Sequence, residues 1–440
     1  MTRDGPPRTR GLLLAAPSSA SGKTVVTLGL LRALSDRGVA VAAAKSGPDY
    51  IDPQFLAAAA RGCCVNLDAW AMSTERLRAL ASRSDLLLVE GAMGLFDGAP
   101  PNGRGSAGDL AAILGLPVVL VVDASRTGHS IAPLVQGFVD WRADLHVAGV
   151  ILNRVGSPRH ETMLRRALAD ARVAVLGAVP RVEALRLPSR HLGLVQAHEH
   201  ATLEAHIETA AMTVEAHVDV AAIAAAARTI ETGPTDGERT TGLPPLGQHI
   251  AVASDVAFAF AYPHMLDDWR RTGASFSFFS PLADEPPRCD ADAIFLAGGY
   301  PELHGGRLAA AERFKTGLRD AAAAGALIYG ECGGYMVLGD GMVDGDGTYH
   351  AMAGLLPLTT SFARRQRVLG YRRLTAWEGL PWAGPLAGHE YHYATTTKTG
   401  GVPALFAARD AEGAALDAMG LRVGRMMGSF AHVIDRASEG

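Results

Sequence analysis

Short apolar runs alternate with helical stretches through the first half of the chain. The run at 11–17 leads into a glycine–lysine turn, and the segment 24–38 then carries apolar residues at helical spacing up to a final glycine. Further apolar runs follow at 39–46, 85–92, 117–125, 147–155 and 174–180. Strands that are apolar throughout are typical of a parallel sheet with helices on both faces. The pattern predicts a doubly wound α/β domain whose ligand lies at the carboxyl ends of the strands.

The pattern changes in the middle of the chain. Residues 229–247 are polar and rich in Gly, Pro and Thr, which is typical of a linker. A second α/β pattern then begins, with apolar runs at 249–255, 274–280, 292–299 and 325–331. We therefore expect one domain at 1–228 and a second at 248–440, joined by a linker at 229–247.

Composition narrows the class of protein. The chain has 440 residues, of which 48% are hydrophobic and 20% charged, and its formal net charge is −4. This charge gives no basic field for nucleic acid, and no apolar run is long enough to cross a bilayer. The apolar stretch Leu12–Ala16 is too short for a secretion signal, and the four cysteines form no CxxC pair. We expect a cytoplasmic protein with no membrane or nucleic-acid partner.

The stretch Ser21-Gly22-Lys23-Thr24 ends like a phosphate-binding loop. Gly22 permits close approach of a phosphate, Lys23 supplies charge for the β and γ oxygens, and Thr24 supplies a hydroxyl for Mg²⁺. Pro17 stands where the usual pattern has its first glycine, but it removes an N–H only at the loop entrance. The alternative is a serine-rich turn with an incidental lysine. The preceding strand and following helix favour an ATP site.

Acidic residues follow two other strands of this domain. Asp49 and Asp52 lie in the loop after 39–46, Glu90 lies at the end of its strand, and Asp97 lies in the loop beyond. Each alone would be a solvated carboxylate or a helix cap, but acidic loops beside a phosphate loop indicate a metal–phosphate site. Asn153 ends a further strand and is either a reader of the adenine edge or a turn residue.

The second domain contains a cysteine in a glycine-rich turn. An apolar strand runs into Gly330–Gly334, which places Cys332 in the arrangement of a nucleophile elbow. We expect the following helix N-terminus to lower the pKa of the thiol, and the Gly333 N–H to face an oxyanion with a second donor from Gly298 or Gly299. The alternative is a buried structural cysteine. The elbow context favours the nucleophile.

A cysteine nucleophile needs a base, and the second half offers His389, His392 and His432. Spacing alone does not choose among them. An ATP site joined to a cysteine site that cleaves amides suggests one coupled reaction. The cysteine domain releases ammonia from glutamine, the ATP domain phosphorylates a carboxylate, and ammonia displaces the phosphate to give an amide.

With these motifs in order, nearly the whole chain resembles the glutamine-dependent cobyrinic or hydrogenobyrinic acid a,c-diamide synthases of cobalamin biosynthesis. The resemblance is carried by "APSSASGKT", "KSGPDYIDP", "VEGAMGLFDG", "LPSRHLGLVQAHE", "AGGYPE", "YGECGGYMVLG", "GHEYHY" and "GSFAHVID". It implies a dethiobiotin-synthetase-like ATP domain followed by a class I glutamine amidotransferase-like domain. Its substrates would be a corrin acid, ATP and glutamine, and a homodimer is implied.

By this resemblance Cys332 is the nucleophile and His432 its partner. For the oxyanion donors predicted from the elbow, we take Gly299 and Gly333. Most class I amidotransferases have a glutamate two residues after that histidine. Here the position is Ile434, so the usual triad acid is missing and the orientation of His432 is unexplained.

The resemblance also divides the acidic residues of the ATP domain between two roles. It places Asp49 and Glu90 near Mg²⁺, and Tyr50, Asp52 and Asp97 near the corrin carboxylates or their phosphorylated intermediate. Nothing in the sequence says whether the corrin carries cobalt.

Three other readings remain. Cobyric acid synthase amidates other corrin side chains, but "KSGPDYIDP" and the moderate length favour the diamide synthase. A partitioning ATPase would carry a lysine at Ser18 and would have no use for the cysteine domain. A non-enzymatic binding module would not need Lys23, Thr24 and Cys332.

Overall fold

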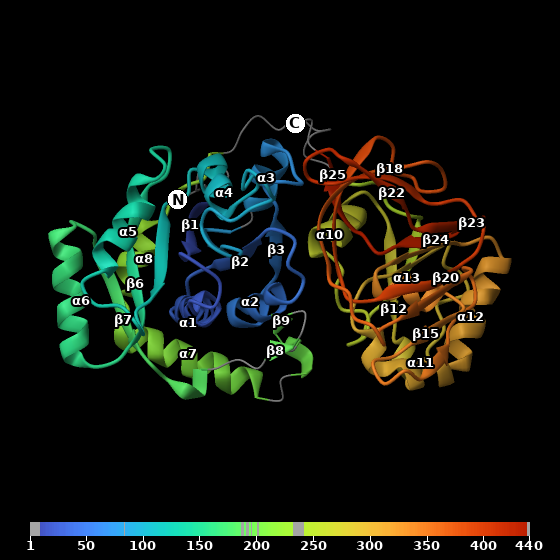
Figure 1. The fold of residues 1–440 in the computed structure, drawn as a ribbon, viewed down its shortest axis with the longest axis horizontal. Coiled ribbons are helices and arrows are strands. Elements are labelled where there is room, and N and C mark those ends of the chain that lie inside the picture. The colour runs from blue at the N-terminus through green and yellow to red at the C-terminus, as the bar shows by residue number, and fades with distance from the viewer. Residues whose placement is uncertain are drawn as a thin grey trace, which may run out of the picture. The chain divides into compact units, whose positions relative to one another are not determined.

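The computed structural model describes residues 9–82, 84–185, 189–190, 193–194, 196–199, 202–231 and 242–437. The chain forms two compact units, Met1–Thr240 and Thr241–Gly440, each described here by itself (Figure 1). Residues 232–241 of the predicted linker lie outside the described residues, as do 187–188, 191–192 and 195 of "LPSRHLGLVQAHE". The predicted domain limits stay a prediction.

The first unit is built on one eight-stranded sheet in the order β3-β2-β4-β1-β5-β6-β7, with β10 beside β1. Its strands are β1 (Arg10–Ala15), β2 (Val41–Ser46), β3 (Cys64–Leu67), β4 (Leu86–Glu90), β5 (Val118–Asp123), β6 (Val147–Val155), β7 (Val175–Pro180) and β10 (Arg228–Thr229). All pairs are parallel except β1 with β10. Because strand order reverses around β1, the loop after β1 is a point where a ligand can bind.

Helices cover both faces of this sheet, as continuous apolar strands require. One face carries α1 (Lys23–Asp36), α2 (Asp52–Ala60) and α7 (Leu203–His217), which pack together (Figure 1). The crossovers between the remaining parallel strands are α3 (Thr74–Ala81), α4 (Ala107–Leu114), α5 (Ile131–Asp140) and α6 (Pro158–Asp170), and α8 (Val220–Ala226) contacts α1. Short elements lie at Glu183–Leu185, Ser189–Arg190, Gly193–Leu194 and Ala197–Glu199.

The second unit has a six-stranded sheet in the order β12-β11-β13-β14-β24-β23. Its strands are β11 (His249–Ala253), β12 (Ser275–Phe279), β13 (Ala293–Leu296), β14 (Leu327–Glu331), β23 (Leu421–Val423) and β24 (Met426–Ser429), and only β23 with β24 is antiparallel. The helices are α10 (Pro263–Arg271), α11 (Gly305–Ala310), α12 (Glu312–Ala323) and α13 (Gly333–Leu338), with short turns at Pro281–Ala283 and Pro301–His304. A buried core that includes Phe258, Phe314 and Met336 joins sheet and helices.

Two smaller sheets complete the second unit. One has the order β16-β15-β17-β20, formed by β15 (Gly341–Val343), β16 (Tyr349–Ala351), β17 (Leu358–Ser361) and β20 (Thr395–Thr399). The other has the order β22-β21-β18-β19-β25, formed by β18 (Val368–Ala376), β19 (Pro385–His392), β21 (Phe406–Arg409), β22 (Ala415–Met419) and β25 (His432–Arg436). The register of β19 with β25 pairs His389 with His432.

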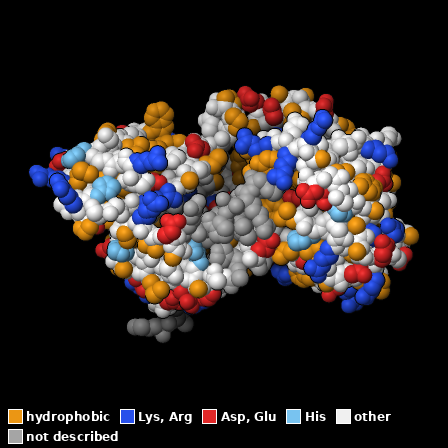
Figure 2. Space-filling view, turned by 60° about the horizontal axis from the view of Figure 1, so that its bottom comes forward, with side chains coloured by type: hydrophobic (Ala, Val, Ile, Leu, Met, Phe, Trp, Pro, Cys, Tyr) orange, Lys and Arg blue, Asp and Glu red, His pale blue; other side chains and the backbone are white. Residues whose placement is uncertain are grey.

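The predicted fold class is confirmed. The first unit is a parallel sheet with the phosphate loop after its first strand, and the second unit is also α/β. On the face drawn in Figure 2, acidic and basic side chains both occur on each unit. No helix in the described part of the chain is long and apolar enough to cross a membrane.

Candidate active sites

The phosphate-loop sequence forms the turn between β1 and α1. Gly22 precedes the first residue of α1 with φ of 86°, and Ala20 also has a positive φ of 62°. The Ser21 hydroxyl donates to the carbonyl of Ser18 at 2.8 Å, which closes the loop on itself. The strand–loop–helix context that the motif needs is therefore present, with Lys23 as the first residue of the helix.

Asn153, at the end of β6, supports this loop. Its Nδ2 donates to the carbonyl of Ser21 at 2.8 Å, and its Oδ1 accepts from the N–H of Arg154. A methyl group at Gly22 would lie 2.1 Å from Nδ2, so the asparagine lies directly against the loop backbone. Contact with adenine stays a prediction, whereas the contact with the loop is the role that the geometry gives this side chain.

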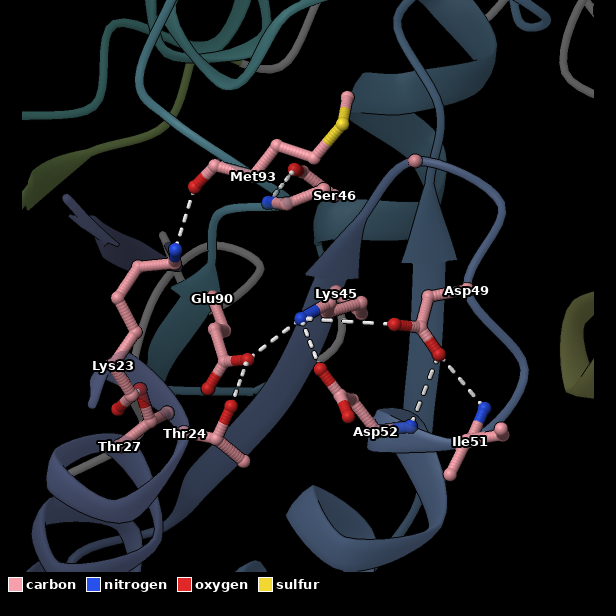
Figure 3. Close-up of polar contacts among 12 residues, drawn as sticks. Lys23, Thr24, Thr27, Lys45, Ser46, Asp49, Ile51, Asp52, Glu90 and Met93 are labelled. Carbon is pink, nitrogen blue, oxygen red and sulfur yellow. Dashed lines mark hydrogen bonds and ion pairs between the residues drawn. The ribbon is translucent and has the colours of Figure 1, made fainter. Parts of the chain in front are cut away.

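Lys23 bends back over the loop. Its Nζ donates to the carbonyl of Met93, in the segment after β4, at 2.5 Å (Figure 3). Burial lowers the pKa of Lys23, although the nearby carboxylates, Glu90 foremost, oppose the shift. The segment after β4 thus supplies a carbonyl that holds the ammonium beside the loop.

A chain of polar contacts links Thr24 to the loop after β2 (Figure 3). The Thr24 hydroxyl donates to Oε1 of Glu90 at 3.0 Å, and Lys45 Nζ contacts the same oxygen at 2.6 Å. Lys45 Nζ also contacts Asp52 at 2.6 Å and lies 4.0 Å from Asp49. Parallel register places Lys45 of β2 opposite Glu90 of β4, which is why residues 45 positions apart meet.

Burial and neighbouring charges shift the pKa values of the residues in this network of polar contacts. Burial opposes the charged form of Lys45, but the carboxylates of Asp52, Glu90 and Asp49 outweigh it and raise the pKa of Lys45 well above its ordinary value. Burial, and next the charge of Asp52, raises the pKa of Asp49 to about 7. Burial also opposes ionisation of Asp52, yet the Lys45 ammonium holds the pKa of Asp52 below its ordinary value. Lys45 is thus the cation that keeps the acidic chain together.

The network of polar contacts brings together two of the three residues predicted to hold a metal ion, Thr24 and Glu90. Thr24 lies against Glu90, and the second carboxylate oxygen of Glu90 is buried without a hydrogen-bond partner in the described part of the protein. A hydroxyl beside a carboxylate with a spare oxygen fits Mg²⁺, which takes few protein ligands and completes its shell with phosphate and water. In the described residues, no group of three or more His, Cys, Asp or Glu forms a metal cage.

The other predicted residues lie farther along the same loops. Asp49 Oδ1 accepts from the N–H groups of Ile51 and Asp52, so this carboxylate also shapes the start of α2. Tyr50 beside it is buried. Asp97 is exposed, and its Oδ2 accepts from the N–H of Gly94 at 2.8 Å. In Figure 3, Lys45 lies between Glu90 and Asp49. Asp49 is therefore linked to Glu90 through the Lys45 ammonium.

In the second unit, Cys332 lies at a sharp turn between β14 and α13. Its φ of 45° and ψ of −102° are unusual for a side-chain-bearing residue, as expected at a nucleophile elbow. Its N–H donates to the carbonyl of Ser429 at 2.8 Å, and its carbonyl accepts from Met336 at 3.0 Å. The backbone on both sides of the turn is thereby fixed.

The expected lowering of the thiol pKa is wrong for this protein. Burial, with the charge of Glu302 next, raises the pKa of Cys332 well above its ordinary value, and the hydrogen bond from the Gly333 N–H opposes this only in part. The cysteine is 4% exposed, and desolvation of the thiolate outweighs one N–H of a six-residue helix. At neutral pH the free protein holds Cys332 as a thiol.

The two predicted oxyanion donors lie side by side. A methyl group at Gly333 would lie 2.9 Å from the nitrogen of Gly299, and one at Gly299 would lie 2.0 Å from the carbonyl of Ala257. Both positions therefore require glycine. The Gly333 N–H already contacts the sulfur, so this pair of peptide groups lies next to the Cys332 thiol.

Among the three histidines, His432 lies beside the cysteine. A methyl group at Gly298 would lie 2.9 Å from His432 Nε2 and 3.3 Å from the Cβ of Cys332, so the imidazole ring and the Cys332 side chain lie on either side of Gly298. His392 instead contacts Glu390 and the Ala394 carbonyl through its two ring nitrogens.

Two residues with no role in the sequence reasoning occupy these sites. Lys45 is one, and Glu331, directly before Cys332, is the other. Oε2 of Glu331 lies 3.8 Å from Nδ1 of His432, and both side chains are fully buried. Each could have been found from the sequence as an ionisable residue at the end of an apolar strand. Burying a charge there costs free energy unless the charge has a partner, so such a residue indicates a site.

Comparison with known proteins defines the class. Residues 12–195 match a family model described as a CobQ/CobB/MinD/ParA nucleotide binding domain, and residues 249–439 match a CobB/CobQ-like glutamine amidotransferase domain. The chain therefore joins a nucleotide-binding domain to a glutamine amidotransferase domain.

Full-length relatives define the family. The chain is 57% identical over 438 residues to the hydrogenobyrinate a,c-diamide synthase of Brucella anthropi, covering 98% of this chain and 99% of the relative. It is 56% identical to the protein of that name from Sinorhizobium sp over 433 residues (97% and 99%), and 50% identical to that from Rhodobacter capsulatus over 434 residues (97% and 98%). The chain belongs to the hydrogenobyrinate a,c-diamide synthase family. This confirms the resemblance and the prediction that the chain is an enzyme.

Proposed function

We propose that this enzyme amidates the a and c carboxylates of hydrogenobyrinic acid with ATP and with ammonia drawn from glutamine. The observation that carries the proposal is the identity of 50–57% to relatives of that name along nearly the whole chain. The geometry of both sites supports it, because each has the groups that one half of the reaction needs. The metal-free corrin is the substrate that the relatives' names favour over its cobalt counterpart.

The nucleotide half would activate the carboxylate. A corrin carboxylate oxygen attacks the γ-phosphorus of ATP, which forms an acyl phosphate and releases ADP. The loop residues Ser21, Gly22 and Lys23 would hold the phosphates. Asn153 would hold the loop in place through its hydrogen bond to the Ser21 carbonyl. Thr24 and Glu90, with Asp49, would hold Mg²⁺, which when bound neutralises phosphate charge.

The corrin would approach from the loops after β2 and β4. We assign Tyr50, Asp52 and Asp97 to positioning the corrin or its phosphorylated form, since they lie beyond the metal-binding residues along these loops. Asp52 would act together with Lys45, which it contacts at 2.6 Å. A cation beside these acids is suited to hold a substrate carboxylate while the phosphoryl group is transferred.

The cysteine half would supply ammonia. His432 Nε2 takes the Cys332 proton, and the sulfur attacks the side-chain carbonyl carbon of glutamine. Gly299 and Gly333 would donate to the resulting oxyanion. The C–N bond breaks, ammonia leaves with the proton from His432, and water hydrolyses the thioester to glutamate. Ammonia then attacks the acyl phosphate and releases phosphate. A cytoplasmic location and a homodimer stay predictions.

The test separates the two halves. Wild type should convert hydrogenobyrinic acid to its diamide with glutamine or with ammonium. Cys332→Ala should lose the glutamine-driven reaction and keep the ammonium-driven one, and Lys23→Ala should lose both. Cys289→Ala, which changes an exposed free thiol, is the matched control and should keep both. Ammonium-driven synthesis in Lys23→Ala, or glutamine-driven synthesis in Cys332→Ala, would contradict the proposal. Cobyrinic acid in parallel decides the substrate.

A further inference from the structure

His432 lacks an acid at the usual place. The residue two positions later on β25 is Ile434, which is buried and cannot accept a hydrogen bond through its side chain. A histidine base works as a base only if one nitrogen carries the proton and the other presents its lone pair to the nucleophile. Something else must fix the tautomer.

Glu331 is placed to do this. It is the last residue of β14, directly before Cys332, and its Oε2 lies 3.8 Å from His432 Nδ1. Its other oxygen, Oε1, accepts from the Val433 N–H at 3.0 Å and from the Tyr329 hydroxyl at 3.1 Å. Oε2 itself has no hydrogen-bond partner in the described part of the chain. The carboxyl group is thus clamped by one oxygen while the other faces the imidazole.

We infer that Glu331 is the positioning acid of the amidotransferase site: its Oε2 accepts the Nδ1 proton of His432, so that the lone pair of Nε2 takes the thiol proton of Cys332. The inference rests on the proposed function, since it needs Cys332 and His432 as nucleophile and base. A shift of about 0.8 Å brings the two atoms to hydrogen-bond distance, and catalytic contacts commonly tighten when substrate binds.

The proton balance of the step is simple. The thiol proton moves to Nε2, the Nδ1 proton stays between the ring and Oε2, and no proton is lost to solvent. The Glu331 carboxylate, 3.8 Å from Nδ1, can stabilise the imidazolium that forms.

Another buried acid of this unit is already engaged. Glu390 accepts from Arg372 Nε at 2.7 Å and contacts His392 Nε2 at 3.1 Å. Burial is the main cause that lowers the pKa of His432. Positive charge on His389 and His392 lowers it further, so these two histidines oppose the imidazolium. Glu331 is therefore the acid that the geometry assigns to His432.

The experiment compares Glu331→Gln with Cys332→Ala and with the exposed matched control Glu412→Gln. Glu331→Gln keeps the shape and both contacts of Oε1 but offers no charge to the imidazolium. We expect kcat for glutamine hydrolysis to fall at least about tenfold, with KM for glutamine within about threefold of wild type and with ammonium-driven synthesis intact. Circular dichroism confirms folding, and Glu412→Gln should match wild type. Tyr329→Phe, which removes only one contact of Oε1, should lose less than Glu331→Gln.

The outcomes are distinct. A folded Glu331→Gln with wild-type kcat overturns this inference alone if Cys332→Ala has lost glutamine hydrolysis. Retained hydrolysis in Cys332→Ala overturns the proposed function itself. If Glu331→Gln does not fold, a crystal structure of wild type alkylated on Cys332 by a glutamine-derived diazoketone decides. A Nδ1–Oε2 distance within about 3.2 Å supports the inference, and a separation no shorter than the present one overturns it.

Discussion

Gly298 is the position where one added methyl group tests the cysteine site most directly. In Gly298→Ala the new carbon would lie 2.2 Å from Cε1 and 2.9 Å from Nε2 of His432, and 3.3 Å from the Cβ of Cys332. Gly298 does not have a positive φ, so alanine fits the backbone and the perturbation is purely steric. Since carbon atoms in contact prefer about 3.5 Å or more, the imidazole must retreat by about 1.3 Å.

That displacement sets the expected magnitude. A misplacement of about 1 Å costs about 100-fold in rate, which corresponds to about 2.7 kcal/mol in the activation free energy. Overpacking also lowers the free energy of unfolding by about 1–3 kcal/mol. We therefore expect kcat for glutamine hydrolysis to fall about 100-fold in a protein that still folds.

The assay measures glutamine hydrolysis and ammonium-driven synthesis in the same preparation. Ammonium-driven synthesis should be unchanged, because it does not use His432. Gly306→Ala is the matched control: its methyl group would meet its nearest neighbour, His350, at 3.8 Å, which is ordinary contact. Glutamine hydrolysis in Gly298→Ala within about threefold of wild type would refute the reasoning, since a ring displaced this far cannot serve as the base.

Three further outcomes follow from the contacts. Asn153→Ala removes the donor to the Ser21 carbonyl, so KM for ATP should rise about tenfold with glutamine and ammonium alike, measured by steady-state kinetics; an unchanged KM would contradict the bracing role. Lys45→Met leaves buried carboxylates unpaired and should lower the free energy of unfolding by about 3–5 kcal/mol in urea titrations. Burial raises the pKa of Glu331 to about 8, so kcat/KM for glutamine hydrolysis should rise with pH through that value as Glu331 ionises, and Glu331→Gln should lack this rise.

The strands of the parallel sheets could be predicted because both of their faces are buried. Runs such as 86–89 and 118–122 are apolar without alternation, which is typical of strands in a parallel sheet covered by helices on both faces. The antiparallel five-stranded sheet of the second unit gave no such signal. Strand β22 is exposed along almost its whole length and β18 is largely half-buried, and neither has the continuous apolar run or the strict alternation that marks a strand.

The site was predictable only where local sequence fixes it. The phosphate loop and the elbow at Cys332 are each made by a few consecutive residues, so their motifs suffice. Lys45 meets Glu90 through strand register, and Glu331 meets His432 across 101 positions through the pairing of separate strands. Such contacts depend on topology, which the pattern of apolar residues alone does not give.

Charge separation is the remaining problem at the cysteine. Burial keeps Cys332 as a thiol, lowers the pKa of His432 to about 3 and raises that of Glu331 to about 8, so all three groups favour their neutral forms in the free protein. Transfer of the thiol proton creates a negative sulfur and a positive ring in a site with little water. The Gly333 N–H stabilises the first and the Glu331 carboxylate the second. Since burial favours the neutral thiol and the neutral ring, losing either stabilising partner should slow transfer of the thiol proton and lower kcat for glutamine hydrolysis.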